Sequence, residues 1–119
     1  MGKYRYFLLL ASAFVGSVGA SPSSPSAKED AAIGLLLSAL RTSHFFSGRV
    51  ALDCVGFSVP SSDGENYEID VRETHARGCP GDFGVEPVIE TFRVNLSTHR
   101  ILLLDISTGD YINFSSARK

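Results

Sequence analysis

Tyr67-Glu68-Ile69-Asp70-Val71-Arg72 is the stretch of sequence that indicates the fold most clearly. Apolar and charged residues alternate along it, which is the pattern of a β-strand with one buried face and one solvated face. Turn-forming residues bound it on both sides, from Pro60 to Asn66 before it and from Thr74 to Pro87 after it. The pattern predicts a half-buried strand between two connections.

Four further apolar segments predict strands on either side of this one. Residues 50–55 alternate in the same way until Gly56, which breaks the pattern and indicates a β-bulge. Downstream, the segments 88–94, 101–105 and 111–114 are separated by short runs of turn residues. Short connections between consecutive strands favour an antiparallel meander.

Residues 27–43 have the spacing of an amphipathic helix. The apolar positions that recur at intervals of three or four are Ile33, Leu36, Leu37 and Leu40. Ser26 and Glu29 fit a capping box at its start. Gly34 costs about 1 kcal/mol relative to alanine inside a helix, or it marks a close approach to another backbone. The fold class is therefore α+β: one N-terminal helix packed on a four- to five-stranded antiparallel meander sheet, which buries both apolar surfaces at once.

The first twenty residues have the features of a secretory signal peptide. Lys3 and Arg5 precede an apolar run over 7–18, and small residues follow at Val18-Gly19-Ala20. We expect cleavage after Ala20, a flexible polar tether over 21–26 and one domain over 27–119, in a secreted or periplasmic protein. The alternative is an uncleaved anchor helix, but the apolar run is short for one.

The composition excludes several classes of protein. The 119 residues include eleven Lys+Arg and thirteen Asp+Glu, and the net charge of -2 gives no basic patch for a nucleic acid. The chain is too short for a multidomain enzyme. No apolar run predicts a transmembrane span in the mature form.

Cys54 and Cys79 are the only cysteines in the chain. An even count in an exported chain predicts one disulfide. On the chain-entropy model, the bridge would contribute about 3 kcal/mol. A metal or redox pair is the alternative, but there is no Cys-x-x-Cys and His75 is the nearest histidine, which makes a poor tetrahedral set. We therefore expect no metal and no cofactor.

The Gly/Pro-rich segment 75–84 carries the candidate binding residues, which are His75, Arg77, Asp82 and Phe83. Long connections in compact domains are often functional. A bridge at Cys79 would hold this loop in one conformation and lower the entropic cost of binding. Arg77 offers a fork for a carboxylate and Phe83 an apolar anchor. The alternative is that the bridge only pins a connection.

Little in the sequence indicates catalysis. His75 near Glu73 would form an acid/base pair, but a disulfide removes Cys79 as a nucleophile, and no Gly-x-Ser-x-Gly elbow is present. The strand carboxylates of Asp53, Glu68 and Asp70 fall on the polar face. We expect no catalytic residue and predict a non-catalytic binding module whose partner is a protein or a cell-envelope component. A small exported enzyme or enzyme inhibitor, and a secreted effector or immunity-type protein, are the alternatives.

Two histidines and two glycosylation sequons receive no binding role. His44 falls at the end of the predicted helix, where the helix dipole favours a cation, and His99 falls in a tight turn. The sequons begin at Asn95 and Asn113 and matter only if the source secretes through an endoplasmic reticulum.

A helix followed by an antiparallel meander resembles the cystatin-like architecture. The segments 67–75, 79–82 and 92–102 resemble small exported bacterial cystatin-like and PepSY-like proteins of unknown function. In those proteins the closing hairpin turns through Thr-Gly, and here His99 stands where that glycine would be. The Gln-x-Val-x-Gly and Pro-Trp hairpins of true cystatin inhibitors are missing. The resemblance therefore implies an exported α+β domain without cysteine-protease inhibition.

Overall fold

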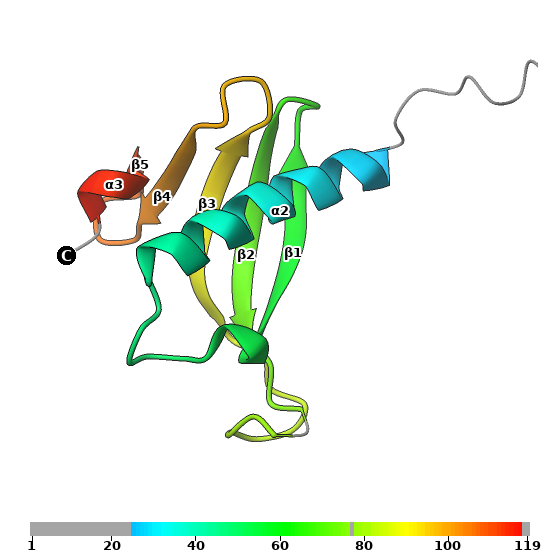
Figure 1. Cartoon of the computed structure of the whole chain (residues 1–119), viewed down its shortest axis with the longest axis vertical. Helices are drawn as coiled ribbons and strands as arrows, with labels where there is room; N and C mark the ends of the chain where they lie inside the picture. Colours follow the sequence, from blue (N-terminus) through cyan, green and yellow to red (C-terminus); the bar gives the residue numbers. More distant parts are fainter. Residues whose placement is uncertain (1–24, 77, 118–119) are drawn as a thin grey trace, which may run out of the picture.

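The computed structural model describes residues 25–76 and 78–117, and it contains one long helix followed by a five-stranded sheet (Figure 1). The elements in chain order are α2 (Pro25–Ser43), the 3-10 turn η2 (Leu52–Cys54), β1 (Val55–Ser62), β2 (Asn66–Glu73), β3 (Val88–Asn95), β4 (Ile101–Asp105), β5 (Asp110–Asn113) and the short helix α3 (Phe114–Ala117). Every neighbouring pair of strands is antiparallel, in the spatial order β1-β2-β3-β4-β5. The predicted α+β meander is confirmed.

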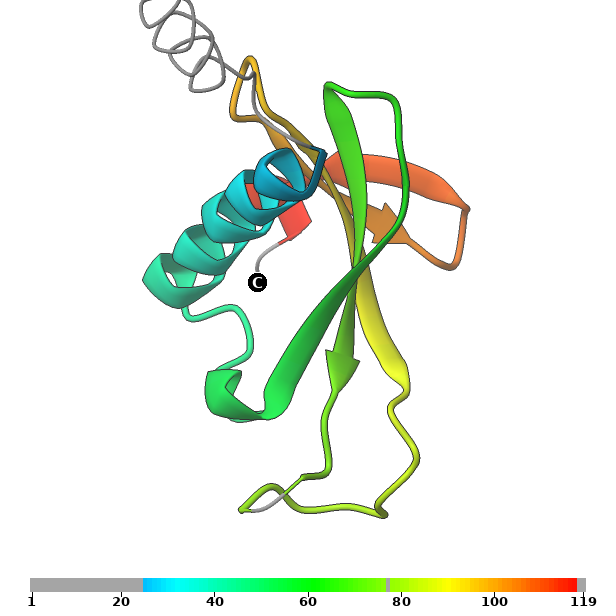
Figure 2. The ribbon, with the colours of Figure 1, turned by 90° about the vertical axis from the view of Figure 1, so that its right-hand side faces the viewer.

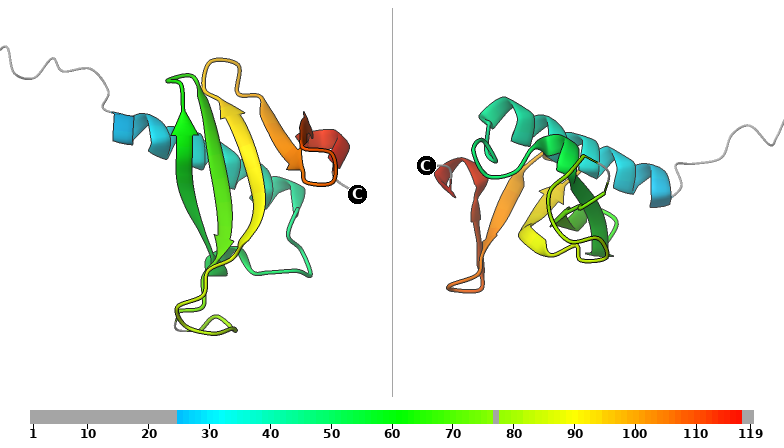
Figure 3. Two further views of the ribbon diagram at one scale, coloured as in Figure 1. Left: turned by 180° about the vertical axis from the view of Figure 1, so that it is seen from behind. Right: turned by 90° about the horizontal axis from the view of Figure 1, so that it is seen from below.

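Helix α2 lies obliquely across one face of the sheet, as the edge-on view shows (Figure 2). No other described element covers the opposite face, which is open when the molecule is seen from behind (Figure 3). No helix among residues 25–76 and 78–117 has the length and apolar character needed to cross a membrane.

The core lies between α2 and the middle strands. Its fully buried side chains come from the helix (Ala32, Leu36, Leu40), from β2 (Ile69, Val71) and from β3 (Phe92, Val94). Alternation along β2 places Ile69 and Val71 toward the helix and leaves Glu68 and Asp70 on the open face. The sequence pattern thus decides which face of the sheet the helix covers.

An aromatic cluster closes the core beyond the end of α2. The ring of Phe45 lies 5.0 Å from that of Phe46, 5.8 Å from Phe92 and 5.4 Å from Phe114, measured between centroids. Phe114 opens α3, so the predicted last strand over 111–114 ends one residue early, at Asn113. These edge-to-face and tilted contacts join the segment directly after α2 to the middle of β3 and to α3.

The predicted strand over 50–55 is wrong. Residues 52–54 form η2, and β1 begins only at Val55 and continues through Pro60 to Ser62. The Thr74 amide donates to the Cys54 carbonyl at 2.9 Å, which fixes the start of the β1–β2 ladder there. Pro60 is tolerated because β1 is an edge strand, and the register shift lies between Ser58 and Ser61 instead of at Gly56.

The helix also starts earlier than the sequence predicts. Pro25 and Ser26, expected in the polar tether, belong to α2, and Ser26 lies inside the first turn instead of at the N-cap. Proline suits this position because the first helical amides have no intrahelical acceptor. The predicted signal peptide over 1–20, and 21–24 of the tether, lie outside the described residues.

Two histidines adopt a left-handed backbone conformation. His44 has φ 55° directly after α2, and His99 has φ 64° in the β3–β4 turn. The His99 amide donates to the Asn95 carbonyl at 2.8 Å, which closes that turn. The position where the sequence suggested a missing glycine therefore has the backbone conformation that glycine adopts most easily.

Replacing Gly34 with alanine is expected to stabilise the fold. A Cβ at Gly34 would meet nothing within 4 Å, so the close approach considered from the sequence does not occur. Gly34→Ala should raise the free energy of unfolding by about 0.5–1 kcal/mol in equilibrium urea denaturation. Gly56→Ala is the control and should give no gain, because its Cβ would lie 3.2 Å from the Thr74 side chain. A loss of stability in Gly34→Ala would contradict this account of α2.

Candidate functional site

The connection between β2 and β3, residues 74–87, extends from one end of the sheet beside η2 (Figure 1). The Glu73 amide donates to the Pro87 carbonyl at 3.0 Å, so the two ends of the connection are held together. Beyond that point the segment leaves the ladder and depends on other contacts for its shape.

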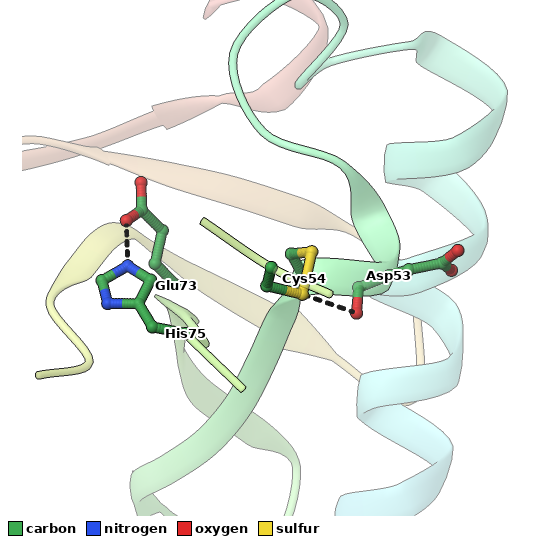
Figure 4. Close-up of a disulfide and its surroundings, with 5 residues drawn as sticks. Asp53, Cys54, Glu73 and His75 are labelled. Atoms are coloured by element: carbon green, nitrogen blue, oxygen red, sulfur yellow. Dashed lines mark hydrogen bonds and ion pairs between the residues drawn. A yellow bond between two sulfur atoms is a disulfide. The ribbon is translucent and has the colours of Figure 1, made fainter. Parts of the chain in front are cut away.

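The disulfide between Cys54 and Cys79 is the first of these contacts (Figure 4). The two Cα atoms lie 5.6 Å apart, and Cys54 is 8% exposed. Because Cys54 belongs to η2, the bridge ties the middle of the loop to the turn that precedes β1. The predicted pairing is confirmed. Among the described residues, no group of three or more His, Cys, Asp or Glu side chains could hold a metal ion.

His75 makes the second contact from inside the loop. Its Nε2 lies 2.7 Å from a Glu73 carboxylate oxygen, and its Nδ1 lies 2.9 Å from the backbone carbonyl oxygen of Asp82. The imidazole side chain is only 9% exposed. Figure 4 shows the ring pointing back at Glu73.

Both partners of the His75 ring are acceptors, so the ring satisfies both only by donating from both nitrogens. That is the protonated form. The hydrogen bond that the ring donates to Glu73, followed by the one that it donates to the Asp82 carbonyl, raises the pKa of His75 above its ordinary value. The cationic ring therefore acts as a clip across the loop, joining its start at Glu73 to Asp82.

Gly81 packs directly against the His75 ring. A Cβ at this position would overlap the imidazole, and the backbone has φ 121°, a region that other residues rarely adopt. The glycine lets the chain fold back over His75 and brings the Asp82 carbonyl within reach of Nδ1.

The predicted site residues have different positions in this loop. His75 and Asp82 are brought together, although Asp82 contributes its backbone carbonyl and its side chain is exposed. Phe83 is 78% exposed and lies beside a cavity of about 440 Å³ that His75 also lines. Arg77 lies outside the described residues.

Two residues that the sequence analysis did not select as binding residues also have exposed apolar side chains near Phe83 in the chain, one in the loop and one at the start of β3. Val85 is 51% exposed and Val88 is 43% exposed. For Val85 the signal was present, because an apolar residue in a Gly/Pro-rich connection has no strand or helix periodicity that would bury it. Val88 gave no such signal, because it falls in the strand predicted over 88–94.

The open face of the sheet carries an internally connected polar network. Glu68 accepts hydrogen bonds from Tyr111 and Ser61, and the Arg93 guanidinium lies 4.0 Å from the centroid of the Tyr111 ring. The hydrogen bond from Tyr111 is the largest cause of the lowered pKa of Glu68. Burial, followed by the hydrogen bond to Glu68, raises the pKa of Tyr111 to about 12. Asp70 accepts from Thr91 at 2.8 Å. These carboxylates are engaged with neighbouring side chains on the polar face.

The geometry at His75 does not suit general acid/base catalysis. A general base needs a ring nitrogen with a free lone pair directed at substrate. Both nitrogens of His75 face acceptors within the protein, and Cys79 is oxidised. What the contacts do support is a loop held in one conformation.

No protein-family model, no curated protein and no solved structure matches this chain.

Removing the bridge is expected to destabilise the domain. Cys54→Ser combined with Cys79→Ser should lower the free energy of unfolding by about 3 kcal/mol, because the unfolded chain regains the freedom of the closed loop. Equilibrium urea denaturation measures the loss. Wild-type protein in excess reductant is the matched control and should lose the same amount. Equal stability of the oxidised and reduced proteins would contradict a stabilising bridge.

The contribution of His75 to stability should depend on pH. The pKa of His75 is raised in the folded protein, so its stabilisation is complete below the unfolded-state value of about 6.5 and is lost as the pH rises through the folded-state pKa. The difference in unfolding free energy between wild type and His75→Gln should therefore shrink between acid and alkaline pH. In a Glu73→Gln background that pH dependence should be weaker, because the largest cause of the shift is gone. A difference that grows with pH would refute the cationic clip.

Proposed function

We propose that this chain is an exported, non-catalytic binding module that contacts a protein partner through residues 83–88. The single observation that supports this most is where apolar side chains are exposed. Among the described residues, the large apolar side chains that are exposed are Phe83, Val85, Val88 and Ile106. All but Ile106 lie within residues 83–88, which comprise the end of the β2–β3 loop and the first residue of β3.

Exposed apolar side chains that are concentrated in one place are typical of interaction sites. Phe83 is the natural anchor, because aromatic residues dominate the energetics of protein interfaces by filling a pocket on the partner. Its 78% exposure means that most of its surface is available to be buried on binding.

The loop is also held in place before any partner arrives. The Cys54–Cys79 bridge fixes its middle, and His75 joins Glu73 to Asp82, the residue that precedes Phe83. Presenting an anchor from a rigid loop reduces the conformational entropy lost on binding. This arrangement favours binding over a connection that is merely pinned.

An exported location is part of the proposal. A disulfide persists in the oxidising environment outside the cytoplasm, which agrees with the signal peptide expected from the sequence. A protein partner in the cell envelope or outside the cell would meet the loop there.

Site-specific photocrosslinking tests the contact. A photoreactive amino acid at position 83 should give one discrete crosslinked product in the compartment where the protein accumulates. Ile106 is 89% exposed in the β4–β5 turn and provides the matched control position. Excess wild-type protein should abolish the product at position 83, and excess Phe83→Ser protein should not. Identical products from positions 83 and 106 would reject a specific contact at this loop.

A further inference from the structure

A groove of about 570 Å³ lies at the C-terminal end of α2, beside the segment that leads to η2. Its lining residues come from the last turn of α2, from the segment that follows α2 and from Leu52 at the start of η2. The groove is separate from residues 83–88 and shares no lining residue with the cavity beside Phe83. Its volume falls in the range of small-molecule sites.

The floor of this groove is apolar. Leu40 and Phe46 are 1% and 2% exposed and belong to the core. Val50 and Leu52 are half-buried and pack against that core. An aliphatic group placed here would therefore leave water and contact a preformed apolar surface.

The rim of the groove is cationic. Arg41 and Arg49 line it and both are exposed, whereas no Asp or Glu is among the lining residues. In the part of the chain that the structure describes, the Arg41 guanidinium has no hydrogen-bond or ion-pair partner. In a chain with a net charge of -2, this is a local concentration of positive charge.

Two contacts hold the Arg49 side chain in place, an ion pair with Glu90 and a cation–π contact with Phe46. One guanidinium nitrogen lies 3.1 Å from a Glu90 oxygen, and the guanidinium carbon lies 5.0 Å from the centroid of the Phe46 ring. A guanidinium carries five N–H donors, and Glu90 engages one nitrogen. The side chain is therefore positioned while donors are left for a second anion.

His44 completes the rim from the residue after α2. The His44 amide donates to the Arg41 carbonyl and the Phe45 amide to the Leu40 carbonyl, both at 3.3 Å, which is the Schellman closure of a helix. The closure satisfies two carbonyls of a helix end that would otherwise repel an anion. Glycine is favoured at this left-handed position, and here the residue is a histidine that lines the groove.

From this combination we infer that the groove binds a small organic anion consisting of one carboxylate and an aliphatic chain. The aliphatic chain of the ligand contacts the half-buried side chains of Val50 and Leu52, which pack on the core, and the carboxylate accepts hydrogen bonds from Arg41 at the rim. Arg41, whose guanidinium has no partner among the described residues, matches a single negative charge, and guanidinium–carboxylate pairs have favourable geometry. The groove is independent of the proposed protein contact at residues 83–88.

Decanoate, used below its micelle-forming concentration, is the probe for this site. In titrations followed by amide chemical shifts, decanoate should shift residues 40–52 saturably and leave residues 83–88 unchanged. Decanol lacks the charge and acetate lacks the chain, so both should bind at least about fivefold more weakly. Equal affinity for decanol and decanoate, or shifts centred elsewhere, would overturn the inference.

Two matched pairs of variants separate charge from folding. Ala51 is exposed, lines the groove and makes no side-chain cap, so Ala51→Glu and Ala51→Gln should fold alike. Ala51→Glu should weaken decanoate binding about tenfold through like-charge repulsion, and Ala51→Gln should not. Arg41→Gln should weaken it about fivefold, whereas Arg100→Gln, an exposed arginine at the β3–β4 turn, should have no effect.

The outcomes of these titrations are decisive for the groove alone. Phe83→Ser should bind decanoate like the wild type, so failure of the protein contact leaves this result intact. If the two Ala51 variants bind decanoate equally, or if Arg41→Gln and Arg100→Gln behave alike, the cationic rim has no role and the inference is wrong.

Discussion

The burial of one stripe of α2 against β2 and β3 is the contact on which the rest of the structure depends. Leu36 and Leu40 of the helix meet Ile69, Val71 and Phe92 of the sheet, and all are at most 1% exposed. A chain of this size buries a modest share of its surface, so one such interface supplies most of the driving force for folding. It also determines which sheet face is open and where the ends of α2 fall. The positions of both candidate sites follow from this contact. The groove forms where α2 ends, and the β2–β3 loop projects from the two strands that α2 covers.

The two sites use different physical means to prepare for a ligand. At residues 83–87 the chain has no ladder, and order comes from a covalent bridge and a charged ring between two acceptors. At the groove, order comes from the core itself, because Phe46 and Leu40 are part of it. The conformation of the loop can therefore respond to redox conditions and to pH, whereas the shape of the groove changes only if the packing of the core changes.

How much of this could be predicted from the sequence varies with the range of the interactions. Alternation at Tyr67 to Arg72 and helical spacing at Leu36 and Leu40 are local patterns, and they yielded the helix, the meander and the buried face. The cysteine count was enough for the bridge. The strand expected over 50–55 was wrong. Val50, Leu52 and Cys54 alternate in sequence and are half-buried or buried, but a 3-10 turn at 52–54 accounts for this, and local periodicity does not distinguish such a turn from a strand.

The site was harder to foresee because its contacts involve the backbone. Glu73 and His75 are close in sequence, so their pairing could be predicted. The second acceptor for the His75 ring is the backbone carbonyl of Asp82, and every residue has such a carbonyl, so the sequence does not indicate which one is used. That one carbonyl changes the interpretation of His75 from an acid/base candidate to a structural cation. The groove was also hard to predict. Arg41 and Arg49 line it together because a Schellman motif ends α2 at His44, and glycine, the usual sequence signal of that motif, is absent from this position.

The edges of the sheet have a consequence for behaviour at high concentration. β1 is an outer strand, yet it contains Pro60 and a register shift, and β5 at the other edge is only four residues long and leads into α3. Unprotected outer strands pair with strands of other molecules and seed fibrils, whereas proline, bulges and short length block that growth. A protein built this way should remain dispersed when it accumulates, and intermolecular contacts should be left to side chains instead of main-chain ladders.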